Sequence, residues 1–396
     1  MGKIRLSKMK PNDAIYNLRF GRLCLASLLF SASYNMLIPE LPSYLSSLGG
    51  SEFIGLIIAL FTLTAGLSRP FSGFLTDQIG RKPIMVFGAL ICIISGFLYP
   101  ILGTVAGFLF LRLLHGFSTG FTPTAVAAYV ADIVPKTRWG EAFGIQGLFF
   151  TSGLALGPAI GSSIKLFYSY QVLFVCSSLM ALLSLVLIYR LQETLKKTHS
   201  FKWSMLMISK NDIISKAVLT PALITFLTYF SFGMILTLIP DWSDYLGLKN
   251  KGTFFMVFTI ASLAIRFLSG KVSDKVGRRK VCIAGLLVLT ISLVMMGFFG
   301  TWHGLLIAAA FYGLSMGILS PALNAWTTDL SPVNGRGKGI STMFIALEAG
   351  IGLGALLSGL YYRDVYQNIP LTMFACAILG VIGLFFLLLV RRTPRV

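Results

Sequence analysis

Apolar stretches of about 20 residues recur along the whole chain, and they constrain its fold more than any other feature of the sequence. Clear examples are residues 20–38, 84–102 and 371–390. As an α-helix that rises 1.5 Å per residue, each stretch is long enough to cross a hydrocarbon core about 30 Å thick. The mean hydropathy of +0.81 and the charged fraction of 12% exclude an ordinary soluble domain. The pattern therefore predicts an all-α membrane protein.

Twelve membrane-spanning helices are predicted from these stretches. They cover residues 18–39, 52–76, 83–102, 105–133, 139–164, 168–190, 218–240, 252–273, 280–299, 302–330, 337–361 and 369–390. Of the 33 lysines and arginines, 26 lie in loops or at span ends on the side of the two termini and four on the opposite side; Arg69, Arg112 and Arg266 lie deeper inside spans. Because basic loops face the cytoplasm, both termini are expected there, in a multi-pass protein of the cell membrane (the inner membrane of a bacterium). The formal charge of +19 is spread over short loops, so no nucleic-acid partner is expected.

The sequence contains no motif for catalysis or metal binding. Its five cysteines fall singly inside apolar spans, without the paired spacing of metal or redox sites. P-loop and HExxH patterns are absent from it, and its two GxSxG matches, at residues 116–120 and 313–317, lie inside apolar stretches. We therefore expect no enzyme, no cofactor and no metal site, and any transport by such a chain would draw on an ion gradient or on the gradient of the substrate itself.

The second half of the chain repeats the first at an offset of 197 residues. Gly73, Asp77, Gly80 and Arg81 return as Gly270, Asp274, Gly277 and Arg278, and Arg69 and Asp132 return as Arg266 and Asp329. This repeat predicts two six-helix halves, residues 1–190 and 218–396, joined by a cytoplasmic linker at residues 191–217. Two such halves place a binding site at their interface, and rocking of the halves gives alternating access.

Three signatures make the chain similar to a known family. The repeated loop motif resembles the signature G-x-L-A-D-R-x-G-R-K/R of the major facilitator superfamily, with departures at Thr76 and Gln78. The fourth-span signature is matched by Arg112 and Gly116, with His115 in place of Gln, and the antiporter signature G-x-x-x-G-P-x-x-G-G by Gly153, Gly157, Pro158 and Gly161. The chain thus resembles the twelve-span drug/proton antiporters. That resemblance implies the twelve-helix fold and export of a small molecule in exchange for protons.

Charged residues at the cytoplasmic ends of the spans form two candidate gate networks. They are Asp77, Arg81 and Asp132 in the first half and Asp274, Arg278 and Asp329 in the second. The resemblance implies that these charges hold the cytoplasmic mouth closed, although they would equally fix loop structure and orientation. The glycines of the antiporter signature would either form a hinge around Pro158 or pack two helices closely.

Polar residues inside spans that the repeat does not duplicate are candidates for the transport site. Arg112, His115, Asn324 and Glu348 stand opposite Ala309, Tyr312, Ala127 and Thr151. Glu348 is the candidate proton carrier, unless Arg69 holds it in a permanent ion pair. Arg112 would hold a partner carboxylate ionised or would bond backbone carbonyls. His115 would relay protons or, when neutral, would donate one hydrogen bond.

The remaining candidates are weaker, and the function has rival interpretations. Glu40 is matched by Asp241 at an offset of 201, which favours a structural role; Tyr34, Asn35 and Gln146 would line a cavity or pack. We expect a monomer that exports a small organic or amphipathic molecule against protons. The alternatives are a proton-coupled importer of a polar nutrient and a receptor or lipid-handling scaffold that does not transport.

Overall fold

The computed structural model describes residues 17–134, 139–195, 198–206, 214–331 and 336–389, and these ranges contain thirteen α-helices. The first half comprises α1 (Leu18–Asn35), α2 (Leu41–Ser47), α3 (Ile54–Gln78), α4 (Arg81–Leu98), α5 (Val105–Ile133), α6 (Trp139–Phe167) and α7 (Tyr170–Tyr189). The second half comprises α8 (Leu219–Tyr245), α9 (Gly252–Val276), α10 (Arg278–Phe298), α11 (Trp302–Leu330), α12 (Arg336–Tyr362) and α13 (Asn368–Leu389). Short 3-10 turns cover Ser51–Phe53, Trp203–Leu206 and Lys216–Val218. Each helix except the short α2 corresponds to one of the twelve predicted spans, with ends that differ by up to five residues.

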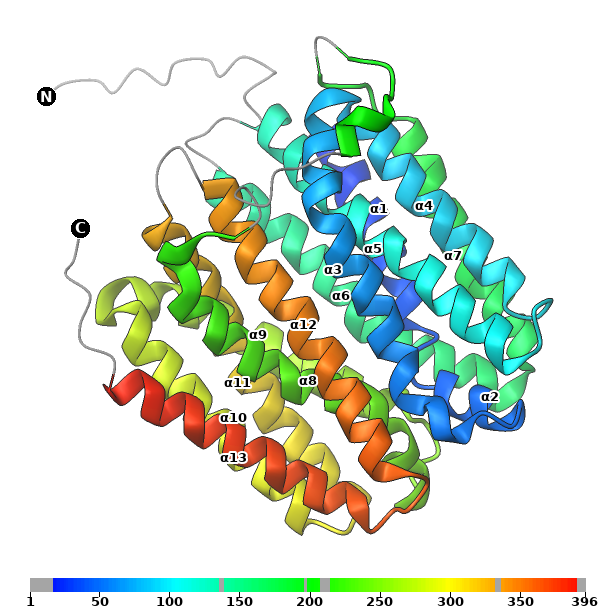
Figure 1. Ribbon diagram of the computed structural model, residues 1–396, viewed down its shortest axis with the longest axis vertical. Helices are drawn as coiled ribbons and strands as arrows, with labels where there is room; N and C mark the ends of the chain where they lie inside the picture. Colours follow the sequence, from blue (N-terminus) through cyan, green and yellow to red (C-terminus); the bar gives the residue numbers. More distant parts are fainter. Residues whose placement is uncertain (1–16, 135–138, 196–197, 207–213, 332–335, 390–396) are drawn as a thin grey trace, which may run out of the picture.

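The helices form two bundles that lie side by side (Figure 1). Across their interface α3 packs against α12, and α6 packs against α9. These two contacts are equivalent under the sequence repeat, because α9 repeats α3 and α12 repeats α6. The interface between halves is therefore built from two related helix pairs.

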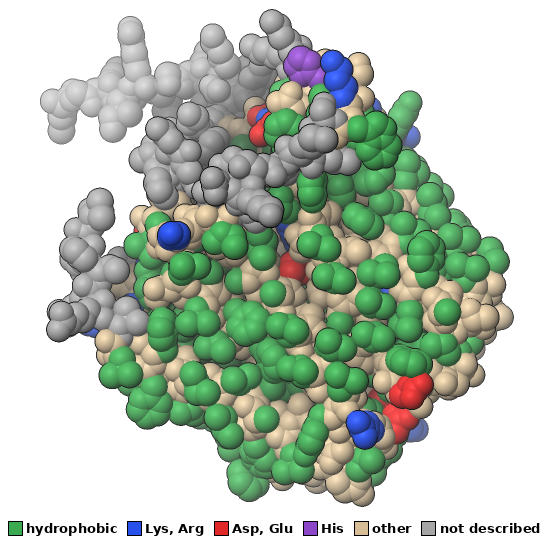
Figure 2. Space-filling model, viewed as in Figure 1, with side chains coloured by type: hydrophobic (Ala, Val, Ile, Leu, Met, Phe, Trp, Pro, Cys, Tyr) green, Lys and Arg blue, Asp and Glu red, His purple; other side chains and the backbone are tan. Residues whose placement is uncertain are grey.

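Nine of the described helical segments are long and apolar enough to cross a membrane. Besides the short α2, the helices α1, α5 and α9 fall outside this set; α5 contains Arg112 and His115, and the apolar part of α9 is limited to Gly252–Arg266. Hydrophobic side chains cover the face shown in Figure 2, and its charged side chains lie mainly towards the ends of the helices. Such a surface is suited to a hydrocarbon environment.

Local signals explain several helix starts, and the repeat preserves them. The hydroxyls of Thr104 and Thr301 accept hydrogen bonds from the backbone N–H groups of Gly107 and Gly304, which caps α5 and α11. Gly80 and Gly277 precede α4 and α10 with φ of 129° and 100°. Side chains avoid this conformation, so the glycines of the loop signature have a backbone reason.

Two predicted spans, 18–39 and 218–240, are wrong at their ends. Residues 18–39 were expected to form one helix, but α1 stops at Asn35 and a turn leads to α2. Pro39 and Pro42 lack the N–H groups that a continuing helix needs. The repeated sequence around Pro240 nevertheless lies inside α8, which continues to Tyr245. The same short motif therefore breaks the helix in one half and not in the other.

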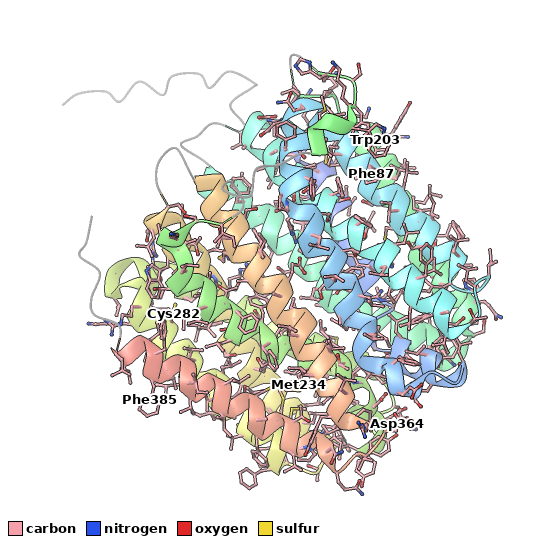
Figure 3. All side chains as sticks on the ribbon, viewed as in Figure 1. Phe87, Trp203, Met234, Cys282, Asp364 and Phe385 are labelled. Carbon is pink, nitrogen blue, oxygen red and sulfur yellow. The ribbon has the colours of Figure 1, made fainter. Side chains whose placement is uncertain are left out.

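The molecule has two distinct ends, which Trp203 and Asp364 mark in Figure 3. Trp203 belongs to the segment between the halves, and we name its side the linker end. Asp364 follows α12 and marks the opposite end. Towards this opposite end, buried Ile54, Ile239 and Ile351 belong to one apolar cluster that both halves share. Apolar packing thus holds the two halves together on this side.

Candidate functional site

An ion pair joins the two halves between α3 and α12. The Arg69 Nη2 atom lies 2.9 Å from Glu348 Oε1, and the two side chains are only 14% and 9% exposed. The Arg69 guanidinium also lies over the Phe344 ring, 4.9 Å from its centroid. At Gly66, a Cβ atom would lie 3.1 Å from the Cβ of Glu348, so glycine gives the carboxylate room. Such a pair can persist only while α3 and α12 stay together.

The equivalent position on the other side of the interface lacks a carboxylate. Arg266 on α9 repeats Arg69, and its Nη1 atom donates to the Thr151 hydroxyl on α6 at 3.3 Å. Thr151 occupies the place that Glu348 has in the repeat. In the described part of the chain, Arg266 forms no ion pair. The two inter-half contacts are thus similar in geometry and different in charge.

Arg112 is an internal anchor of the first half. It is 2% exposed, and its Nε atom donates to the Ile57 carbonyl at 2.8 Å. Its Nη1 atom donates to the Tyr99 hydroxyl at 3.3 Å, and the guanidinium lies 4.4 Å from the Phe61 ring centroid. These contacts correspond to the alternative of a structural arginine; the expected partner carboxylate is not among its described contacts.

His115 belongs to the same buried cluster. Its ring nitrogens lie 3.2 Å from Cys92 Sγ and 3.3 Å from the Tyr99 hydroxyl. It is completely buried, and its ring packs edge-on against Phe61. A short polar cluster without an accessible acid suits hydrogen bonding better than proton relay.

The other candidate lining residues make local contacts. Asn35 donates to the backbone and hydroxyl oxygens of Ser31, and Asn324 donates to the Ser320 carbonyl. Gln146 donates to the Ser27 hydroxyl at 3.3 Å, which joins α6 to α1. Tyr34 packs between Phe30 and Phe61. Among the described contacts, none joins Gln146 or Asn324 to Tyr34 or Asn35.

At the linker end of the first half, Arg81 binds two carboxylates. Its Nη1 atom lies 2.7 Å from Asp77 Oδ1, and its Nε atom lies 2.9 Å from Asp132 Oδ2. The segment between the halves joins this network, because the Thr194 hydroxyl donates to Asp132 at 2.6 Å. Glu193 also accepts the backbone N–H groups of Arg81 at 3.1 Å and Lys82 at 2.9 Å. Sequence analysis missed Glu193 and Thr194, because a side chain that caps a helix 112 residues away in the sequence leaves no local pattern.

The second half has a corresponding pair between Arg278 and Asp329. The Arg278 Nε atom lies 2.9 Å from Asp329 Oδ2. The side chain of Asp274 lies outside the described residues. The described ion pairs of both networks thus form within a half and not across the mouth.

The antiporter signature packs α6 onto α1. A Cβ atom at Gly153 or Gly157 would come within 2.8 Å of the backbone of α1, at Leu28 and Ala32, and one at Gly161 would meet the backbone of Met36, which directly follows α1. In the other half, Gly350 and Gly354 lie in the same way against α8. The packing alternative for these glycines thus has a direct structural basis.

Pro158 and Ser162, from the same part of α6, form contacts to the second half. Gly252 packs closely against Pro158, because a Cβ atom at Gly252 would lie only 2.2 Å from the Pro158 carbonyl oxygen. The Ser162 hydroxyl accepts the Gly252 N–H at 3.2 Å and donates to Glu40 at 2.7 Å. The Lys251 ammonium donates to the Ser43 hydroxyl at 2.7 Å. We call these residues the end latch (Ser43, Pro158, Ser162, Lys251 and Gly252).

Known proteins share the sequence pattern and the architecture of this chain. The Major Facilitator Superfamily profile matches residues 23–248 and 221–396. Multidrug resistance protein 2 of Bacillus subtilis (strain 168) is 26% identical over 345 residues, which cover 83% of this chain and 84% of the relative. Quinolone resistance protein NorA of Staphylococcus aureus (strain MRSA252) is 25% identical over 355 residues, 85% of this chain and 88% of the relative. The crystal structure of a D-xylose–proton symporter superposes with a TM-score of 0.78 at 17% identity, covering 95% of this chain and 97% of that one. The chain belongs to the Major Facilitator Superfamily and is a secondary transporter rather than an enzyme.

Proposed function

We propose that the protein is a proton-coupled exporter of a small organic or amphipathic molecule, working by alternating access. The observation that carries this proposal is the Arg69–Glu348 contact, the one described ion pair that crosses between the halves. Separation of α3 from α12 would remove the cation from Glu348 and favour proton uptake by the carboxylate. Pairing and protonation would then alternate as the halves rock.

The direction of transport rests on the relatives and on the antiporter signature. Proteins named as multidrug and quinolone resistance proteins align over most of the chain. The end latch supports a state in which the halves are closed at the end opposite the linker. With cytoplasmic termini in the cell membrane, this closed end would face outward, and a monomer would suffice for the cycle. The charge networks at the linker end would then set how readily the other mouth closes.

Reconstituted protein decides among the three functions. A thermal-shift screen with dyes, antibiotics, metallophores and sugars selects a ligand, which is loaded into proteoliposomes before a proton gradient is imposed. An exporter moves the ligand against the proton flow, an importer moves it with the protons, and a receptor or scaffold moves none. Movement in the direction of the protons, or no movement at all, would refute the proposal.

A further inference from the structure

We propose that Arg266 is a subsite for an anionic group of the transported molecule, so that the substrate class is an amphipathic carboxylate or a similar organic anion. This inference rests on the proposed transport function and assigns the chemistry of the same interface. The repeat places Arg69 and Arg266 at equivalent positions on α3 and α9. Arg69 has a carboxylate opposite it on α12, and Arg266 has the hydroxyl of Thr151 opposite it on α6.

The charges within the membrane region do not balance. Arg69, Arg112 and Arg266 lie inside the predicted spans, and Glu348 is the one carboxylate near their middle. Arg112 donates hydrogen bonds to the Ile57 carbonyl and the Tyr99 hydroxyl, and it is only 2% exposed. Arg69 is neutralised by Glu348. The uncompensated positive charge that remains accessible is therefore that of Arg266, which is only half-buried.

The surroundings of Arg266 suit an anion. One guanidinium nitrogen donates the weak hydrogen bond to Thr151, and among the described residues the other N–H groups of the planar fork have no hydrogen-bond acceptor. Tyr229 on α8 lies within electrostatic range of both Arg266 and Glu348, and its ring could pack against an apolar body. A charged group without a counterion is costly at bilayer depth, and an arriving carboxylate would pair with the guanidinium in two parallel hydrogen bonds. The substrate would thus provide the carboxylate that the repeat has replaced by Thr151.

Binding of three probes that share one fluorophore tests this assignment. Dansylglycine is an anion, dansylglycinamide is neutral and dansylcadaverine is a cation. Each is titrated into the full-length protein in lipid nanodiscs, without any proton gradient, so that failure of proton coupling cannot imitate failure of the subsite. We expect dansylglycine to bind about tenfold or more tightly than dansylglycinamide, as for one charge-assisted bidentate contact.

Substitutions locate the preference at Arg266. Arg266→Gln should bring the two dissociation constants to within about threefold of each other, and Arg266→Lys should keep part of the difference. Thr151→Glu supplies the missing carboxylate and should abolish dansylglycine binding, whereas Thr151→Gln, of similar size, should retain the preference. Thermal unfolding confirms that each variant is folded. The proposal is overturned if wild-type protein does not bind dansylglycine, if it prefers either other probe, or if folded Arg266→Gln keeps the preference.

Discussion

The guanidinium of Arg69 lies 2.9 Å from the carboxylate of Glu348, and these two residues come from different halves of the chain. The equivalent Arg266 meets the Thr151 hydroxyl at 3.3 Å instead. One inter-half contact is thus neutral and the other carries a positive charge. Duplication conserved the helix arrangement and the arginines, and the difference lies in a single acidic side chain.

Glu348 should couple transport to protons. Glu348→Gln resembles the protonated carboxyl at nearly the same size, so folding and ligand binding should be retained. Proton-driven accumulation in proteoliposomes should fall about tenfold or more, because the pair can no longer alternate with protonation. Glu40→Gln is the comparison variant and should still accumulate ligand against its gradient, even with a weaker pH dependence of latch closure. The reverse pattern would move the coupling site to Glu40.

Asp132 should matter more than Asp77 for the network at the linker end. The Asp77 side chain is 67% exposed, and such pairs contribute about 0–1 kcal/mol. The Asp132 side chain is 30% exposed and also accepts the Thr194 hydroxyl, so its contacts are worth about 1–3 kcal/mol. Asp132→Asn should therefore slow transport several-fold more than Asp77→Asn at equal expression. Equal transport rates in the two variants would contradict a gating role for this network.

Gly252→Ala should open the end opposite the linker. Its Cβ atom would lie 2.2 Å from the Pro158 carbonyl oxygen, so the closed state should lose about 1–3 kcal/mol. Phe167 and Phe298 are 80% and 73% exposed and can carry spin labels. Double electron–electron resonance between these labels measures the distance between the halves. Gly300→Ala is the control, because a Cβ atom there meets nothing within 4 Å. An unchanged distance distribution in Gly252→Ala would contradict the latch.

Glu40 should make closure of the latch depend on pH. Burial raises the pKa of the Glu40 carboxyl, while the Ser162 hydrogen bond and the Lys251 charge oppose this shift. Asp244 acts in the same direction as burial, and Lys165 acts against it. If opening exposes Glu40 to water, closure is accompanied by proton uptake.

Lower pH should therefore favour closure, and the effect should be lost as pH rises through the raised pKa of the closed state. The same spin-label distances, followed against pH, measure this dependence. In Glu40→Gln the titration should be flatter. If the spin-label distances in the wild type increase on acidification, the predicted pH dependence is wrong.

Topology is open to a chemical test. Ser200 and Val365 are exposed at the linker end and the opposite end, respectively. After replacement of the five native cysteines, Ser200→Cys should react only with a membrane-permeant maleimide in intact cells, and Val365→Cys should also react with an impermeant one. Labelling of Ser200→Cys from outside would invert the assignment of cytoplasmic and outer ends.

Sequence patterns were sufficient for the architecture because each signal is local or periodic. A helix needs about 20 apolar residues to cross a bilayer, whatever its neighbours are. The offset of 197 residues predicted which elements correspond, and the caps at Thr104 and Thr301 keep that offset in the structure. Pro39 and Pro240 show the limit, because one ends a helix and the other does not. A proline removes one hydrogen bond, and tertiary packing decides whether the helix continues.

The sequence by itself determined the membrane-spanning class, the two related halves and the small set of ionisable residues inside the spans. Only the tertiary structure decided which of these residues meet: Arg69 finds Glu348, Arg112 finds the Ile57 carbonyl, and Arg266 finds Thr151. The physical reason is that a helix in lipid is apolar on both its lipid-facing and its protein-facing sides, so hydrophobic periodicity does not reveal which face meets a neighbour. Rotation and close approach of packed helices set those faces, and with them the charge that each side of the interface presents.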